Sequence, residues 1–176
     1  MENTHSRLIT ALFVDFKNAG KAYNAALKLG YKKDEINILM SEETKKCHGH
    51  NRAHENLSLS DEAIKGAGVG GSLGVTTGAI TGAIIAMGTV LAFSGLSLII
   101  SGPIAIALAG ASAGGIAGGL VGALINIGIS EDHAKNCAAE LKNGGILICL
   151  TPYSLDDCKT LEMTWNNYGG TILTSR

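Results

Sequence analysis

The chain has 176 residues and a formal net charge of −1 at pH 7, and charged residues make up 16% of it. This near-neutral balance provides no basic surface of the kind that binds nucleic acid, so it argues against that class of function. All charged residues lie outside residues 66–130, and this uncharged middle is rich in glycine. We therefore expect residues 1–60 and 131–176 to form two halves of one α/β domain, with 61–130 as a separate hairpin between them.

The first polar segment predicts a strand, a helix and a second strand. Residues 7–16, RLITALFVDF, are a near-continuous apolar run, which is typical of a strand covered on both faces. Residues 35–40 alternate between polar and apolar, which favours an edge strand. Between these runs Ala22 and Tyr23 belong to one apolar helical face, and Gly30 suits the end of that helix. The segment thus predicts a βαβ unit.

The polar linker at 41–60 contains four potential metal ligands within eight residues. They are Cys47, His48, His50 and His54. Thiolate and imidazole groups at this density can bind Zn, Cu or Ni. Their spacing matches no established finger or catalytic motif, and the surrounding polar residues favour a solvated linker without metal. The chain has four cysteines and no CxxC pair, and its N-terminus lacks the features of a secretory signal. We therefore expect the polar halves to lie in a reducing cytoplasm. Apart from this possible metal, we expect no cofactor.

Glycine recurs at every fourth position in the uncharged segment. The glycines expected to pack helices together are Gly66, Gly70, Gly74, Gly78, Gly82, Gly110, Gly114, Gly118 and Gly122. Each glycine inside a helix costs about 0.5–1 kcal/mol relative to alanine, so this spacing requires a compensating contact. A glycine stripe lets a second helix approach closely, which is most valuable in a bilayer. We therefore predict a glycine-zipper hairpin of two transmembrane helices, 60–93 and 104–127, with a turn that includes Gly102 and Pro103.

Basic residues flank this hairpin at both ends and are missing from its turn. The positive-inside rule then places both termini in the cytoplasm, with the hairpin in a bacterial inner membrane or seated in one leaflet of it. The alternatives are a buried core of a globular domain, which rarely contains so long an uncharged run, and a disordered segment, for which the apolar content is too high. The glycine rows exceed what one partner helix needs, so we expect a homo-oligomer in the lipid bilayer.

The second polar segment predicts a helix, a strand, a helix and a strand. Ser130 can cap a helix over 131–142, which leads to the apolar strand 145–150, GILICL. Ser154 can cap the next helix, which leads to a strand at 171–175. The two polar segments together form two split βαβ units, with the first and third strands central and the second and fourth at the edges. The fold class is therefore α+β, a ferredoxin-like sheet interrupted by the hairpin.

The order of these features resembles the bacterial general stress, heat-induced or low-temperature-induced membrane proteins. In that family the hairpin is followed by a helix that begins GI-P/S-E-x-x-A and by a strand that begins with two glycines. The matching residues are Gly128, Ile129, Ser130, Glu131, Ala134, Gly144 and Gly145. The resemblance implies this architecture and a role in envelope or stress adaptation, and it carries no catalytic residues.

These observations predict a non-enzymatic integral membrane protein that self-associates through its glycine-zipper helices and displays a small cytoplasmic α/β domain. Its mechanism would be packing, with many hairpins acting as a membrane scaffold. An alternative is an oligomeric channel or pore lined by threonine, serine and glycine faces. A third hypothesis is a sensor of a small ligand or a metal, built on the cytoplasmic sheet.

Overall fold

The computed structural model describes residues 8–53, 88–93, 96–113 and 119–173, and over these ranges the chain is α+β. The strands are β1 (Ile9–Phe13), β2 (Asn37–Ser41), β3 (Thr89–Phe93), β4 (Leu96–Ser101), β5 (Ile146–Leu150) and β6 (Thr171–Ile172). The helices are α1 (Phe16–Lys28), α2 (Glu42–Ala53), α5 (Ile104–Ala113), α6 (Gly119–Asn126), α7 (Glu131–Lys142) and α8 (Leu155–Asn167).

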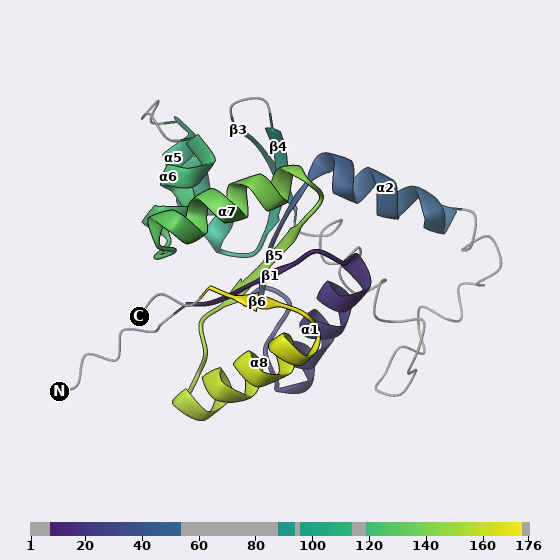
Figure 1. Cartoon of the computed structure of the whole chain (residues 1–176), viewed down its shortest axis with the longest axis vertical. Helices are drawn as coiled ribbons and strands as arrows, with labels where there is room; N and C mark the ends of the chain where they lie inside the picture. Colours follow the sequence, from purple (N-terminus) through teal and green to yellow (C-terminus); the bar gives the residue numbers. More distant parts are fainter. Residues whose placement is uncertain (1–7, 54–87, 94–95, 114–118, 174–176) are drawn as a thin grey trace.

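The strands form one antiparallel sheet with the order β3-β4-β2-β5-β1-β6 (Figure 1). β1 pairs with β5 from Ile9 opposite Leu150 to Phe13 opposite Ile146. β1 and β2 come from the first polar segment and alternate with β5 and β6 from the second. The centre of the sheet therefore requires both ends of the chain.

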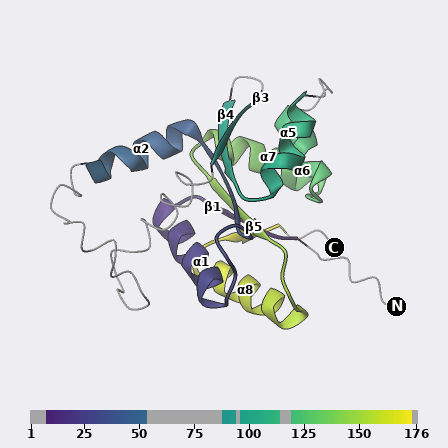
Figure 2. The same cartoon turned by 180° about the vertical axis from the view of Figure 1, so that it is seen from behind.

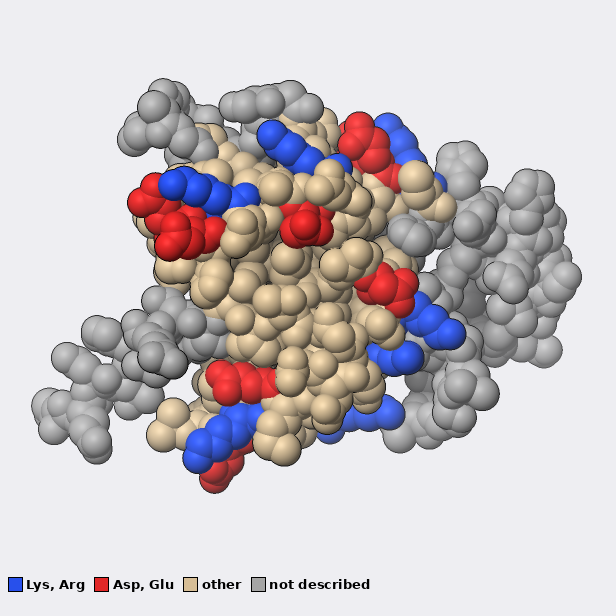
Figure 3. All heavy atoms as spheres, viewed as in Figure 1, with Lys and Arg blue, Asp and Glu red and all other residues tan. Residues whose placement is uncertain are grey.

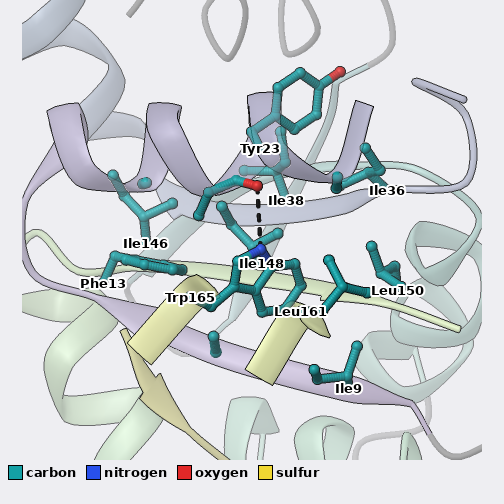
Figure 4. Packing of buried hydrophobic residues seen from close by; sticks show 14 of the residues in the cluster. Ile9, Phe13, Tyr23, Ile36, Ile38, Ile146, Ile148, Leu150, Leu161 and Trp165 are labelled. Atoms are coloured by element: carbon teal, nitrogen blue, oxygen red, sulfur yellow. Dashed lines mark hydrogen bonds between the residues drawn. The ribbon is translucent and has the colours of Figure 1, made fainter. Parts of the chain in front are cut away.

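Helices cover both faces of this sheet, as the two opposite views show (Figures 1 and 2). α1 and α8 lie on one face, where the indole N–H of the fully buried Trp165 donates to the carbonyl oxygen of Ala22 at 3.1 Å (Figure 4). α5, α6 and α7 lie on the other face, where Leu108, Leu124 and Leu141 are fully buried. The result is a three-layer arrangement with a separate apolar core on each side of the sheet.

The helices predicted in the two polar segments are confirmed. α1 buries Ala22 as expected, and Gly30 follows it with the positive φ of +97° that the chain needs to leave the helix. At the start of α8 the hydroxyl of Ser154 accepts the backbone N–H of Asp157 at 3.0 Å. α7 covers the predicted range 131–142 and begins after Ser130, but the Ser130 side chain makes no capping hydrogen bond. An apolar stripe is the local signal that these helices share, and the predicted side-chain cap is confirmed at Ser154.

The edge position predicted for the second strand is wrong. β2 pairs with β5 on one side and with β4 on the other, and all five of its residues are buried. The covering strand β4 and its neighbour β3 lie where we predicted the end of a helix and a turn. Residues 89–93 and 96–101 consist largely of β-branched and large apolar side chains, which suit strands, and only residues 94–95 separate them.

The predicted fold class is also wrong in its hairpin. The four predicted strands are β2, β5, β1 and β6, and they lie in the predicted order with β5 and β1 between the other two. The sheet does not end at β2, however, but continues into β4 and β3. The predicted second helix, 104–127, is divided into α5 and α6, which pack against each other and beside the sheet. Most of the predicted first helix lies outside the described residues, and its last part, 89–93, is the strand β3.

The integral-membrane interpretation is corrected by the lengths of these helices. None of the helices in the described ranges has both the length and the apolar character needed to cross a bilayer. Over the described residues α5 has 10 residues and α6 has 8, so these stretches are about 15 and 12 Å long, against a hydrocarbon core of about 30 Å. Leu108 and Leu124 on these helices are buried in the core that lies against the sheet. The scaffold and channel hypotheses, which both required a spanning hairpin, fall with it.

Candidate functional site

The strand β3 forms one edge of the sheet. It pairs with β4 from Thr89 opposite Ile100 to Phe93 opposite Leu96, without an interruption in register. Among the described residues, β3 has no neighbour on its other side. Half of the backbone N–H and C=O groups of an edge strand point away from its partner and can bind a further strand. The opposite edge, β6, has only two residues and offers much less backbone.

The side chains of β3 differ between its two faces. Leu91 is partly buried and packs against the core on the α5 side. Val90 lies opposite Ile99, so it points to the face that α1 and α8 cover, and 57% of it is exposed. It is exposed because those two helices lie over the middle of the sheet and the β6 side, away from this edge (Figure 1). Ala92, two residues further along, is exposed as well.

A second exposed apolar side chain lies on the helix next to this edge. α5 contacts β3, and its Ile106 is 81% exposed. Ile104 and Leu108 of this helix are buried, so Ile106 between them lies on the face of α5 turned away from the sheet. We call the strand edge the β3 surface, defined by Thr89, Val90, Leu91 and Ala92. It combines backbone that has no neighbour among the described residues with the exposed Val90 and Ala92 on one face and the partly buried Leu91 on the other. This combination is typical of a surface that another protein covers.

Natural edge strands usually carry a device that prevents pairing with another chain. The common devices are a lysine or another charge, a proline, or a bulge that twists the strand away. The sequence of β3, TVLAF, contains no charge and no proline, and its pairing with β4 shows no bulge. The five residues extend over about 17 Å, at roughly 3.4 Å per residue. Within the described ranges, β3 therefore carries no charge, proline or bulge that would block pairing with a further strand.

The base of the hairpin is anchored by a buried asparagine. The side chain of Asn37 donates from Nδ2 to the carbonyl oxygen of Cys149 at 3.1 Å, and its Oδ1 accepts the backbone N–H of Ile104 at 2.8 Å. One side chain thus links β2, β5 and the first residue of α5. The backbone of Gly102 lies against Asn37, so that a Cβ added at Gly102 would lie 2.6 Å from Asn37 Oδ1. This contact fixes where β4 leaves the sheet and where α5 begins.

A cluster of two tyrosines and two carboxylates at another end of the sheet is the other polar candidate. Tyr31 and Tyr153 stack with their ring centroids 4.4 Å apart. The Tyr153 hydroxyl donates to Glu35, and the Tyr31 hydroxyl donates to Asp157 at 3.4 Å. The hydrogen bond to Glu35 is the largest cause that raises the pKa of Tyr153, to about 12. These contacts join the α1–β2 loop to the β5–α8 loop, so we interpret the cluster as a structural clasp.

Charged side chains do not gather into a patch of one sign on the face seen in Figure 3. Lysine and arginine lie among aspartate and glutamate around the rim, and the middle of this face is uncharged. The two ion pairs among the described residues, Lys46 with Glu42 and Lys135 with Glu131, each connect one turn of an exposed helix. Exposed pairs of this kind contribute little to stability, because solvent screens the attraction between the charges. They do not mark a site for a charged ligand.

The four predicted metal ligands lie at and beyond the end of α2. Cys47 is exposed on that helix, whereas the side chains of His48 and His50 and the whole of His54 lie outside the described residues. Over the described part of the chain, no group of three histidine, cysteine, aspartate or glutamate side chains is placed to hold a metal ion. The metal hypothesis stays a prediction.

Most of the glycines predicted to pack helices also lie outside the described residues, namely Gly66, Gly70, Gly74, Gly78, Gly82, Gly114 and Gly118. Gly110 lies within α5 and Gly122 within α6. A Cβ added at Gly122 would meet nothing within 4 Å, so that glycine is in open space. The sequence reasoning missed the β3 surface altogether, although the β-branched and aromatic residues between Thr89 and Phe93 are the signal that could have indicated it.

Comparisons with protein-family models, with curated proteins and with solved structures give no match for this chain. The resemblance to the stress-induced membrane proteins therefore stays a prediction. A function has to be argued from the surfaces of the molecule itself.

Proposed function

We propose that this chain is a non-catalytic binding module that accepts an extended polypeptide strand along the edge of β3. The observation that carries the proposal is a strand edge of five uncharged residues that has no neighbour among the described residues, with Val90 exposed on it. An added strand would gain main-chain hydrogen bonds from β3 and apolar contact on either side of the sheet. Helices cover both faces of the central strands, and their buried side chains form one apolar core on each face.

The attachment of the β3–β4 hairpin to the rest of the sheet supports the same proposal. β4 is hydrogen-bonded to β2 over four residue pairs, and Asn37 holds the chain where β4 leaves the sheet. A preformed edge loses little conformational freedom when a strand binds, which leaves more of the interaction energy for affinity. A strand-binding role therefore needs no rearrangement of the described fold.

The test uses a lysine-flanked peptide of alternating threonine and valine, which offers a strand backbone without any sequence from this chain. We expect the peptide to slow hydrogen exchange at the amides of β3, measured by NMR or mass spectrometry. The variant Val90→Lys should weaken binding at least about tenfold, because it places a charge where the added strand would exclude water. Met163→Lys is the matched control, since Met163 is 68% exposed on α8, away from β3. Equal binding by both variants, or protection away from β3, would overturn the proposal.

A further inference from the structure

We infer that the strand which binds β3 is β3 of a second copy of the chain, in antiparallel pairing about a two-fold axis at Leu91. The inference rests on the proposed function and names its partner. β3 has an odd number of residues, so Leu91 lies at its centre. A two-fold axis there places Leu91 opposite its own copy, Val90 opposite Ala92, and Thr89 opposite Phe93. The contact is isologous, because each copy uses the same surface on its partner.

The charge pattern favours a second copy over a different protein. No charged residue occurs from residue 66 to residue 130, so both β3 and its helical neighbour α5 are uncharged. Such a surface has no charge with which to select a partner of opposite sign, and selection among partners depends strongly on charge. Like charges directly opposite each other in a sheet are destabilising. Pairing of two β3 strands avoids this repulsion, because β3 carries no charge.

The side chains along the edge are also complementary to themselves. On the face turned toward α1, the larger Val90 of one copy meets the smaller Ala92 of the other, so the two exposed positions fill each other's space in both directions. On the opposite face the Leu91 side chains meet at the axis, and α5 contacts β3 on that side.

The register predicts which cysteines can be joined across the dimer. Directly opposed residues in an antiparallel pair have Cα atoms about 4.5 or 5.5 Å apart, within the range that a disulfide bridges. Chains with Val90→Cys and chains with Ala92→Cys are prepared with Cys47→Ser, which removes the exposed native thiol. Both new positions are exposed, so the substitutions should leave the core intact. Air or oxidised glutathione serves as the oxidant, which takes two electrons and two protons from the two thiols as the S–S bond forms.

We expect the mixture of the two variants to form a mixed disulfide dimer, while each variant alone forms at least about tenfold less. Light scattering should give a dimer mass for the unmodified chain, and Val90→Lys should raise the dimer dissociation constant at least about tenfold, with Met163→Lys as control. A monomer that still binds the threonine-valine peptide at β3 would overturn this inference and leave the proposed function standing. A dimer unaffected by Val90→Lys, or equal crosslinking in all three samples, would show that another surface joins the copies. Failure of peptide binding together with a monomer would overturn both proposals.

Discussion

Asn37 is the side chain whose replacement should affect stability most directly. It is 4% exposed, and its amide satisfies two backbone groups that come from distant parts of the chain. Asn37→Ala would leave the carbonyl oxygen of Cys149 and the N–H of Ile104 without these partners. Ile104 N–H is one of the first donors of α5, which have no acceptor within the helix. The substitution therefore acts on β5 and α5 at once.

The size of the effect follows from those two groups. A buried backbone group that loses its partner costs about 1–3 kcal/mol, so Asn37→Ala should lower the free energy of unfolding by about 2–6 kcal/mol. A domain of ordinary stability has about 5–15 kcal/mol in total, so the loss would be severe. Gly102→Ala should also destabilise, since its φ is +97° and its new Cβ would lie 2.6 Å from Asn37 Oδ1.

The assay is urea unfolding followed by circular dichroism, with Asn166→Ala on the exposed face of α8 as the control. The control should change the free energy of unfolding by less than about 0.5 kcal/mol. The double variant of Asn37 and Gly102 should cost less than the sum of the single variants, because Asn37→Ala removes the nearest atom that the new Cβ meets. A loss below about 1 kcal/mol for Asn37→Ala would refute the reasoning, since both hydrogen bonds would then contribute almost nothing.

Two further predictions concern titratable groups. The hydrogen bond from Tyr153 is the largest cause that lowers the pKa of Glu35, so the stability that Glu35 contributes is present above pH 5 and lost as the pH falls through the lowered pKa. The pKa of Tyr153 is raised to about 12, so the stability that Tyr153 contributes is present below pH 10 and lost as the pH rises toward 12. Unfolding midpoints measured against pH should show both losses, and Tyr153→Phe should reduce them; an unchanged profile would contradict the clasp. Burial raises the pKa of Cys137 to about 11 and of Cys149 to about 12, so mass spectrometry after brief treatment with a thiol reagent at pH 8 should find the exposed Cys47 modified and these two intact. Fast modification of either buried thiol would contradict their burial.

The helices of the polar segments could be predicted because their signals are local. The apolar face that includes Ala22, the end of α1 at Gly30 and the cap at Ser154 each lie within a few residues of the structure they specify. The clasp between Tyr31 and Tyr153 had no such signal, since the two rings are brought together only when the loops of distant elements meet. Asn37 likewise looked like part of an edge strand, and its buried role depends on Ile104, 67 residues later.

The membrane prediction is wrong for the described part of the uncharged segment, because the absence of charge does not distinguish lipid from a protein interior. Residues 96–101 are apolar because β4 is covered by neighbours on its sides and by a helical layer, and that cover comes from elsewhere in the fold. Glycine spacing favoured a helix, whereas the pairing of Val90 with Ile99 and its neighbours is non-local and outweighs that local preference. The tertiary context, and not the local pattern, decides between helix and strand here.

The same pairing explains why the molecule has an open edge where it does. A sheet that ended at β2 would expose a strand whose five residues are all buried in this fold, including the polar Asn37 and Ser41. The β3–β4 hairpin covers that strand and moves the open edge outward to residues 89–93, where no charge or proline protects it. Adding a strand to one sheet relocates its edge, whereas closure of the sheet, or the joining of two sheets edge to edge, removes the edge. Pairing of β3 with β3 of a second copy would join the two sheets and remove this edge from both molecules at once, which is the physical reason to look for a dimer at this surface.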